Sequence, residues 1–421
     1  MVPSTVLTKN SDIINCFPGY EFVIDDKGKK HNMYRGVDLG FGGYVIGEPG
    51  VYTNVALIDA ASMHPTSIIL LNKLGEYTQR YANLREARVH IKHHDYESAS
   101  KLFDGKLAKY LTNDDDADAL SSALKLPLNA FFGVSYSDKY EYPSRDSRDL
   151  NNIIALRGAL FMKTLKDEVE KFGFKVISIK TDSCKIPDAT PEIIQFVIDF
   201  GKKYGYEMEH EATYEKLCLV NKAVYIARYD DKGVRNKGGK KARQWDAVGT
   251  QFQIPYVFKT LFSHEPITFK DKCETKKVKS KLYLDFNENL PEGEHDYHFV
   301  GRVGQFCPIK PGCGGGLLVK TGTANKDKYD AVTGTKGYRW MESVTIRGTE
   351  KEADIDESYY RALCDEAIRD IDEYCKKAGK SYEWFVSDDP VPPVGSRPLE
   401  DPLPDFMNIP ETDEEELPWA L

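Results

Sequence analysis

The sequence lacks an uninterrupted apolar run near the length that a membrane-spanning helix needs. Its start, MVPSTVLTKNSD, also lacks a basic stretch followed by an apolar one, which argues against a secretory signal. The eight cysteines include no CxxC pair, and Cys307 and Cys313 do not have zinc-ligand spacing. These absences favour a cytoplasmic protein with reduced thiols and no membrane partner.

An excess of positive charge is also missing, because 57 Lys and Arg residues face 66 Asp and Glu residues, for a net charge of −9. This balance argues at first against a nucleic-acid partner, whose phosphates need clustered Lys and Arg. Many of the acids, however, lie from Val386 onwards, so the remainder of the chain is near neutral. The ranges 233–243 and 270–281 concentrate Lys and Arg, so a basic channel stays compatible with the composition.

The pattern of apolar residues predicts an α+β chain. The run 55–58 predicts a buried strand that ends at Asp59 and is broken by His64 and Pro65. KVISIKTDSCKI predicts a hairpin with Asp182 near its tip, and the range 215–230 predicts paired strands. Residues 1–50, rich in Gly and Tyr, are expected to be mostly loops. Helical periodicity marks the ranges 71–95, 119–133, 151–172, 191–204 and 353–378.

Three separated segments together suggest a chemistry that none suggests alone. Asp59 and Asp182 stand at a strand end and a hairpin tip, where Asp is also common simply as a cap or turn residue. Lys125, Asn129 and Gly133 share one helical face, which by itself is an ordinary helix. Two carboxylates beside a cationic helix are what phosphoryl transfer requires, because acids hold Mg²⁺ and bases neutralise a triphosphate.

A second cationic pair precedes that helix. Arg88 and Lys92 are four residues apart, and such a like-charge pair costs a helix a few tenths of a kcal/mol unless an anion lies between them. The pair therefore indicates either a phosphate site or a solvated helix face.

Six ordered segments carry a family resemblance. They are YRG…GGYV…EP (34–49), DAASMHPTSI (59–68), LREARVHIK (84–92), KLPLNAFFG (125–133), IKTDS (179–183) and NKAVYIA (221–227). They resemble the polymerase region of family B DNA polymerases, especially the bacteriophage forms, over residues 30–350. The resemblance implies an α+β right-hand polymerase fold, with a palm antiparallel sheet, two-helix fingers and a mixed, largely helical thumb. The implied divisions are 1–50 N-terminal segment, 51–70 first part of the palm, 71–135 fingers, 136–245 second part of the palm, 246–385 thumb and 386–421 acidic Pro-rich tail.

The resemblance also implies an activity and the residues that carry it. A template-directed DNA polymerase extends a primer 3′-hydroxyl with dNTPs by using two Mg²⁺ ions, for which Mn²⁺ is a substitute. Asp59 and Asp182 are the implied catalytic residues, and together with the Ala60 carbonyl they form the implied metal site. The residues implied to bind dNTP are Ser62, Met63, His64, Arg88, Lys92, Lys125, Asn129 and Phe132. Those implied to contact DNA are Lys180, Lys222 and Tyr225.

Four positions depart from the family pattern. Lys180 stands in place of the first aspartate of the family's DTD motif, and His64 replaces the tyrosine that excludes a 2′-hydroxyl. Pro127 lies inside a predicted helix, where it removes an amide donor and is expected to bend the chain. Lys222 is one place farther from Tyr225 than the family's KxY spacing. Lys180 leaves open a catalytically inactive DNA-binding scaffold of a replication complex, and His64 leaves open a reverse transcriptase or RNA-synthesising enzyme.

The resemblance further implies partners. The acidic motifs of the family's 3′→5′ exonuclease do not fit before Tyr34, so a separate exonuclease polypeptide is expected beside the primer-template DNA and the dNTPs. The span from Asp59 to Lys125 is short for the extra subdomain of protein-primed relatives, which favours ordinary primed synthesis. The acidic end ETDEEELPWAL is either a solubilising tail or a docking peptide for a sliding clamp or another replication protein. The expected setting is phage DNA replication in the cytoplasm of a host cell.

Overall fold

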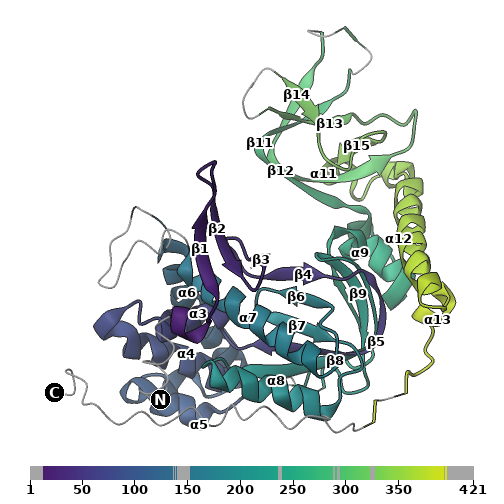
Figure 1. The fold of residues 1–421 in the computed structure, drawn as a ribbon. Helices are drawn as coiled ribbons and strands as arrows, with labels where there is room; N and C mark the ends of the chain where they lie inside the picture. The colour runs from purple at the N-terminus through teal and green to yellow at the C-terminus, as the bar shows by residue number, and fades with distance from the viewer. Residues whose placement is uncertain are drawn as a thin grey trace, which may run out of the picture.

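The computed structural model describes residues 13–135, 137, 139, 152–235, 239–287, 290–291, 294–322, 328–392 and 394–395. Within these ranges the chain forms three sheets, of three, seven and five strands, which confirms a mixed fold with antiparallel sheets. Figure 1 shows a broad body around the seven-stranded sheet, with the five-stranded sheet standing apart from it. None of the helices in the described ranges combines the length and the apolar character that a bilayer crossing requires.

The seven-stranded sheet has the order β10-β9-β8-β5-β7-β6-β4. Its strands are β4 (Val45–Gly47), β5 (Gly50–Ala60), β6 (Ser178–Lys180), β7 (Ser183–Ile186), β8 (Met208–Asn221), β9 (Val224–Tyr229) and β10 (Trp245–Val248). The central strand β5 pairs with β8 on one side and with β7 on the other. These elements confirm the predicted strand that ends near Asp59, the predicted hairpin and the predicted strand pair over 215–230.

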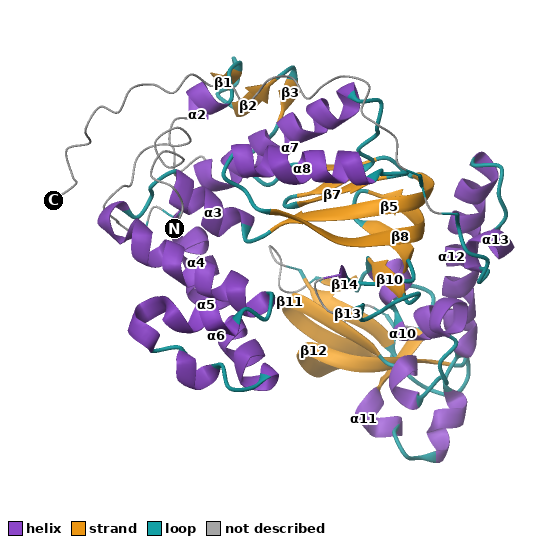
Figure 2. Ribbon diagram, turned by 90° about the horizontal axis from the view of Figure 1, so that it is seen from below, coloured by secondary structure: helices purple, strands orange, loops and turns teal. Residues whose placement is uncertain are grey.

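Two helices cover one face of this sheet, namely α7 (Ile153–Lys171) and α8 (Pro191–Lys203), as Figure 2 shows. Ala56, Ile58 and Ala60 of β5 belong to the core beneath them. Val55 and Leu57 alternate with those residues and belong to a separate cluster with Tyr214 and Tyr225. Because side chains of a strand alternate between faces, Asp59 shares the face of Val55 and Leu57, away from α7 and α8.

A helical segment follows β5 directly. It contains α3 (Met63–Leu70), α4 (Thr78–Lys92), α5 (Tyr96–Lys101) and α6 (Asp114–Ser135), with the 3-10 helices η1 (Gly75–Tyr77), η2 (Leu102–Gly105) and η3 (Ala108–Tyr110). The expected break at His64 and Pro65 is instead the first turn of α3, where a proline is tolerated because its missing N–H has no partner there anyway. The helix α6 continues through Pro127. It is joined to α4 by the Tyr81 hydroxyl, which donates to the Leu128 carbonyl at 2.6 Å.

The N-terminal segment corrects the expectation of loops. Its described part holds α2 (Ile13–Cys16) and a three-stranded sheet of β1 (Tyr20–Ile24), β2 (Lys30–Tyr34) and β3 (Val37–Asp38). The sheet is tied to α7 at Tyr34, whose buried hydroxyl lies 3.0 Å from the Thr164 hydroxyl. The glycines that suggested loops lie in the tight turns of this sheet: Gly28 and Gly36 have positive φ in the two turns that join the strands, and Gly19 and Gly40 have positive φ just before β1 and just after β3.

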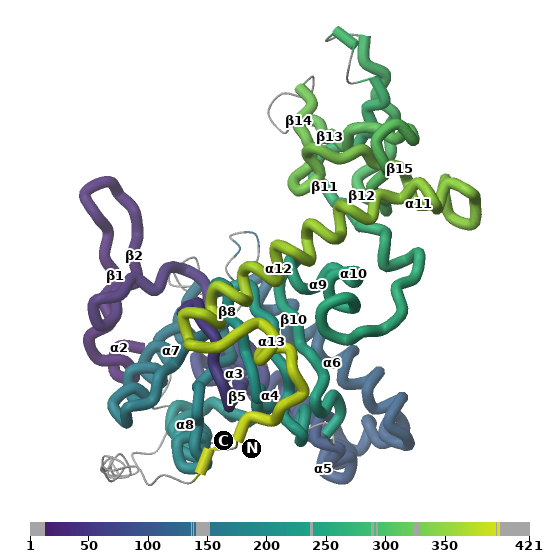
Figure 3. The backbone as a smooth tube through the Cα atoms, turned by 90° about the vertical axis from the view of Figure 1, so that its right-hand side faces the viewer, coloured from purple at the N-terminus to yellow at the C-terminus, as the bar shows by residue number. Residues whose placement is uncertain are grey.

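The range 246–385 is mixed, as expected, and a five-stranded sheet of order β14-β13-β11-β12-β15, which was not predicted, forms its centre. The strands are β11 (Glu274–Asp285), β12 (Tyr297–Ile309), β13 (Leu317–Thr321), β14 (Tyr329–Ala331) and β15 (Arg339–Glu342). The helices are α9 (Thr250–Gln253), α10 (Pro255–Phe258), the π-helix η6 (Lys259–Ser263), the 3-10 helices η7 (Phe269–Lys272) and η8 (Glu350–Asp354), α11 (Ser343–Ile346), α12 (Glu357–Lys377) and α13 (Tyr382–Val386). In Figure 3, α12 runs from the five-stranded sheet back to the seven-stranded one.

Buried charges hold the chain after α13 against the large sheet. The Lys216 ammonium of β8 donates to the carbonyls of Trp384 and Ser387 at 2.8 and 2.9 Å. The Arg228 guanidinium of β9 donates to the Ser387 carbonyl and pairs with Asp388, both at 2.8 Å. The first described residues of the predicted tail are therefore part of the folded body, whereas ETDEEELPWAL lies outside the described residues.

Candidate active site

A cavity of about 560 Å³ lies where the end of β5, the β6–β7 turn and the helices α3, α4 and α6 meet. All the residues predicted to bind metal or dNTP line this cavity. Its complete lining is Asp59, Ala60, Ser62, Met63, His64, Pro65, Arg88, Lys92, Lys125, Leu128, Asn129, Phe132 and Asp182. The structure thus brings together residues that lie as far as 123 positions apart in the chain.

The antiparallel ladder places the two predicted catalytic carboxylates next to each other. Asp59 of β5 is directly opposite Ser183 of β7, and the Ala60 N–H donates to the Asp182 carbonyl at 2.8 Å. Asp182 is the second residue of the two-residue β6–β7 turn, and its own N–H donates to the Lys180 carbonyl, also at 2.8 Å. The backbone bonding on both sides therefore restricts where the Asp182 side chain can point.

The β6–β7 turn rests on a neighbouring backbone segment. Thr181 has a positive φ of 61°, and its N–H donates to the Tyr44 carbonyl at 3.0 Å. A Cβ atom on Gly43 would lie 2.5 Å from the Thr181 hydroxyl oxygen, closer than real Cβ contacts. Glycine at position 43 thus permits the approach that supports the turn carrying Asp182.

Burial makes both carboxylates hard to ionise without a cation, and the neighbouring charge of Asp182 adds to this effect for Asp59. Burial first, and then the neighbouring charge of Asp182, raise the pKa of Asp59 to about 8. Burial likewise raises the pKa of Asp182 above its usual range. Desolvated carboxylates that face one cavity, with a backbone carbonyl beside them, are the oxygen donors that Mg²⁺ prefers. The residues present therefore fit a divalent-cation site.

Cations from two helices face these acids across the cavity. Arg88 and Lys92 come from α4, and Lys125 comes from α6. The Arg88 guanidinium donates to the Ser62 hydroxyl at 3.2 Å, and burial lowers the pKa of Arg88. Lys125 is exposed and therefore free to reach an anion in the cavity. The three side chains thus form one cationic wall, in which Arg88 is held by Ser62 and Lys125 is exposed.

Two rings form the remaining wall of the cavity. His64 of α3 and Phe132 of α6 stack with ring centroids 4.1 Å apart and planes at 23°. Burial lowers the pKa of His64, so the ring is neutral near pH 7. Its Nδ1 is buried without a hydrogen-bond partner among the described residues. A ring wall with one unused polar atom suits the flat face and hydroxyl groups of a nucleoside.

The three residues predicted to contact DNA do not line the cavity. Lys180 is exposed at the end of β6, and Lys222 is exposed in the turn between β8 and β9. Tyr225 is only 8% exposed, and its hydroxyl donates to an Asp246 carboxylate oxygen at 2.9 Å. In this structure Tyr225 is thus a buried support of the sheet rather than an exposed contact.

Acidic residues of β8 are part of the same region but were not among the predicted site residues. Glu209 is directly opposite Asp59 in the β5–β8 ladder, and it lies 2.9 Å from the His93 ring and 3.9 Å from the Lys92 ammonium. Glu207 pairs with Arg85 at 3.0 Å. The alternating acids of EMEHE, at positions 207, 209 and 211, were a signal for this acidic strand edge, but the sequence does not say which strand pairs with which.

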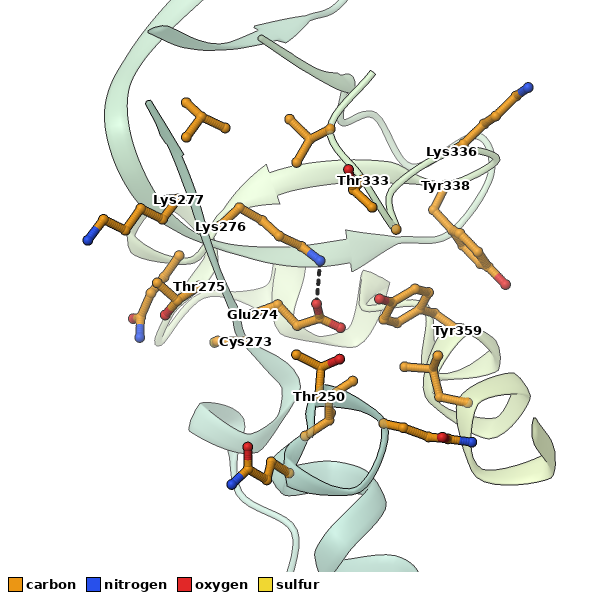
Figure 4. A pocket seen from close by; sticks show the side chains of 18 of the residues that line it. Thr250, Cys273, Glu274, Thr275, Lys276, Lys277, Thr333, Lys336, Tyr338 and Tyr359 are labelled. Atoms are coloured by element: carbon orange, nitrogen blue, oxygen red, sulfur yellow. Dashed lines mark hydrogen bonds and ion pairs between the residues drawn. The ribbon is translucent and has the colours of Figure 1, made fainter. Parts of the chain in front are cut away.

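A larger cavity of about 1790 Å³ lies elsewhere, between the five-stranded sheet and the helices α9, α10 and α12. None of the predicted site residues lines it. Figure 4 shows Lys276 and Glu274 directed toward each other there, with their charged groups 2.5 Å apart, and Tyr359 close by. The smaller cavity is the better candidate for catalysis because it alone, of the two, holds paired desolvated carboxylates.

Comparison with known proteins finds two relatives that are named DNA polymerases. The chain is 25% identical over 280 residues to "DNA polymerase 1" of Sulfolobus acidocaldarius, a match that covers 59% of this chain and 31% of that protein. It is 24% identical over 298 residues to "DNA polymerase" of Pyrococcus glycovorans, covering 62% of this chain and 38% of that protein. The chain thus spans about a third of the length of these relatives. No model of a protein family matches it.

Among solved structures, the family B DNA polymerase of the hyperthermophilic archaeon Pyrobaculum calidifontis aligns with 78% of this chain and 46% of its own. The TM-score is 0.41 and the sequence identity is 13%.

Proposed function

We propose that this protein is a template-directed DNA polymerase that extends a primer 3′-hydroxyl with dNTPs by two-metal nucleotidyl transfer. The observation that carries the proposal is the small cavity, where two desolvated carboxylates face a cationic wall and a pair of rings. The similarity to the archaeal DNA polymerases over about three fifths of the chain supports the same activity. Bacteriophage replication as its setting stays a prediction of the sequence resemblance.

Asp59 and Asp182, with the Ala60 carbonyl, would hold the divalent ions. When bound, such ions supply Lewis-acid charge that neutralises the phosphates and favours ionisation of the attacking hydroxyl. The protein's own part is positional: the β5–β7 ladder would hold the two carboxylates side by side, where a bound cation would favour their ionised form. The raised pKa of Asp59 means that this site favours a cation over an empty, ionised state.

The cationic wall would bind the triphosphate. Arg88 is already fixed by its hydrogen bond to Ser62, so it loses little side-chain freedom when it binds phosphate. Lys92 is drawn toward Glu209, and Lys125 is exposed at the mouth of the cavity. Phe132 and the neutral His64 would pack against the nucleoside, which leaves the His64 Nδ1 to meet a sugar hydroxyl.

Primer extension with Mg²⁺ tests the carboxylates. Asp59→Asn and Asp182→Asn should each reduce incorporation by at least a thousandfold while leaving primer-template binding in place, because each removes a ligand that the chemistry needs. The matched control is Asp199→Asn on α8, an aspartate on the opposite side of the sheet whose partners among the described residues lie on its own helix. Binding of primer-template by the unaltered protein with no incorporation of any nucleotide would point to the scaffold alternative and refute the proposal.

A second measurement tests the cationic wall. Lys125→Ala should weaken dNTP binding about tenfold or more and leave the affinity for primer-template almost unchanged, because Lys125 lines the cavity that holds the carboxylates. Lys101→Ala on α5 is the control, because Lys101 is 68% exposed and pairs with Glu97 away from the cavity. Equal losses of dNTP and DNA affinity in Lys125→Ala would contradict the assignment.

The remaining partners stay predictions. A separate exonuclease polypeptide is expected to copurify with the protein from its native cell, and its absence from repeated pull-downs would remove that prediction. Comparison of dNTPs with NTPs in the extension assay measures whether His64 discriminates against a 2′-hydroxyl.

A further inference from the structure

One face of the five-stranded sheet carries a row of lysines. Along β11, exposed and covered residues alternate, as expected for a strand with one face on a core. Val278, Leu282 and Leu284 face the core that includes α12. Lys277, Lys279 and Lys281 are exposed at alternate positions between them. The β11–β12 register shifts between Lys277 and Leu282, and Lys277 and Lys279 also lie at the edge of the larger cavity.

No acid among the described residues forms an ion pair with these three lysines. Lys276, on the core side of the strand, pairs with Glu274 at 2.5 Å, and Figure 4 shows Lys277 pointing away from that pair. Within the described part of the chain, Lys277, Lys279 and Lys281 form no ion pair. Like charges close together repel each other, so an anion that bridged these lysines would stabilise the row.

An aromatic group continues the row. Tyr283 follows Lys281 on the same face of β11 and is opposite Phe299 of β12, with ring centroids 5.3 Å apart. Tyr297 lies two residues before Phe299 in β12, with its ring centroid 6.4 Å from that of Tyr283. It stacks on Tyr329 of β14, with the two ring centroids 3.7 Å apart. Phe299 is 56% exposed and Val303, opposite Lys277, is 52% exposed, so apolar surface remains open beside the lysines.

We propose that this lysine–aromatic face binds a single strand of nucleic acid. The face is formed by Lys277, Lys279, Lys281, Tyr283, Tyr297 and Phe299. Lysines take the phosphates of a backbone, and exposed aromatic rings take unpaired bases by stacking. A duplex offers only its phosphates here, because its base faces are already stacked inside it. The site is separate from the cavity around Asp59 and goes beyond polymerase activity, which it does not require.

The test is fluorescence anisotropy of the full chain with a labelled oligothymidylate of about 16 nucleotides, compared with a duplex of equal length. Phe299→Ala should weaken single-strand binding about fivefold or more, the lower end of what one base–aromatic stack contributes. Phe299→Trp, which keeps a stacking surface, should restore the affinity. Because Phe299 projects into solvent, neither change is expected to disturb folding, and circular dichroism checks this.

The charge arm uses Lys277→Gln, Lys279→Gln and Lys281→Gln combined. This variant should flatten the plot of log affinity against log salt by about 2, as expected when three phosphate contacts to a single strand are lost. The control combines Lys376→Gln, Lys377→Gln and Lys380→Gln, which removes equal charge from exposed positions at the end of α12. Asp182→Asn should keep full single-strand affinity, so a failure of the polymerase proposal leaves this test intact.

Two results would overturn the inference. One is wild-type single-strand affinity in both Phe299→Ala and the triple lysine variant. The other is duplex binding as tight as single-strand binding with no effect of Phe299→Ala, which means that only backbone charge is read.

Discussion

Replacement of Asp59 by asparagine should stabilise the metal-free protein, although it abolishes the proposed activity. The Asp59 side chain forms no hydrogen bond or ion pair with another described residue, so the substitution removes a buried ionisable group and no partner. Burial and Asp182 raise the pKa of Asp59 from 3.8 to about 8. Between about pH 4 and pH 7, a span of about 3 pH units, the free energy of unfolding therefore falls by about 1.4 kcal/mol per unit. The total loss at pH 7 is about 4 kcal/mol.

The sign follows from proton binding. Between about pH 4 and pH 8 the folded protein keeps a proton on Asp59 that the unfolded chain has released, so the free energy of unfolding falls as the pH rises through this window. The Asp59→Asn variant has no ionisable group at this position, so this fall in the free energy of unfolding is absent from it. The difference between the two proteins should thus be near zero at about pH 4, grow through neutral pH and become constant above about pH 8.

Thermal melting in EDTA measures the effect. For a chain of 421 residues with an unfolding entropy of about 2.1 cal/mol/K per residue, about 4 kcal/mol corresponds to a rise in Tm of about 5 °C at pH 7. Mg²⁺ should raise the Tm of the unaltered protein, more at pH 8 than at pH 5 because protons compete for the ligands, and should raise that of the variant less. A variant Tm that is lower than wild type at pH 7, or a difference that does not change with pH, would refute the account of Asp59.

Three further changes test how the structure positions the site. Gly43→Ala should lower primer extension at least tenfold, because its Cβ displaces Thr181 and with it the metal-binding turn. In the control Gly42→Ala, the added Cβ meets nothing within 4 Å, so primer extension should be unchanged. Equal extension rates in the two glycine variants would contradict the role given to Gly43. Gly133→Ala in α6 also meets nothing within 4 Å and should stabilise the protein by up to about 1 kcal/mol in urea unfolding, whereas a destabilisation contradicts the helix as described. Lys216→Met should destabilise it by about 1 to 3 kcal/mol in the same assay, because two backbone carbonyls lose their buried donor, and no change would mean that the end of the folded body is not held there.

The local parts of the fold were predictable because local spacing determines them. The apolar run before Asp59, the TDS turn and the periodic helices α6, α7 and α8 each show their pattern within one segment. The same holds for the cationic wall, since Arg88 and Lys92 share a helix face at any orientation of α4. The five-stranded sheet was missed because the alternating lysines of β11 indicated a basic patch rather than a strand with one covered face.

The identity and local setting of each reactive side chain, such as Asp59 at a strand end and Asp182 in a turn, can therefore be read from the amino-acid sequence. Which of these side chains meet depends on how the chain folds. The β5–β8 register places Glu209 opposite Asp59, and close packing at Gly43 supports the β6–β7 turn. The Tyr225 hydroxyl is buried where it donates to Asp246. Strand pairing and burial depend on contacts between distant segments, and such contacts leave no periodic trace in either segment alone.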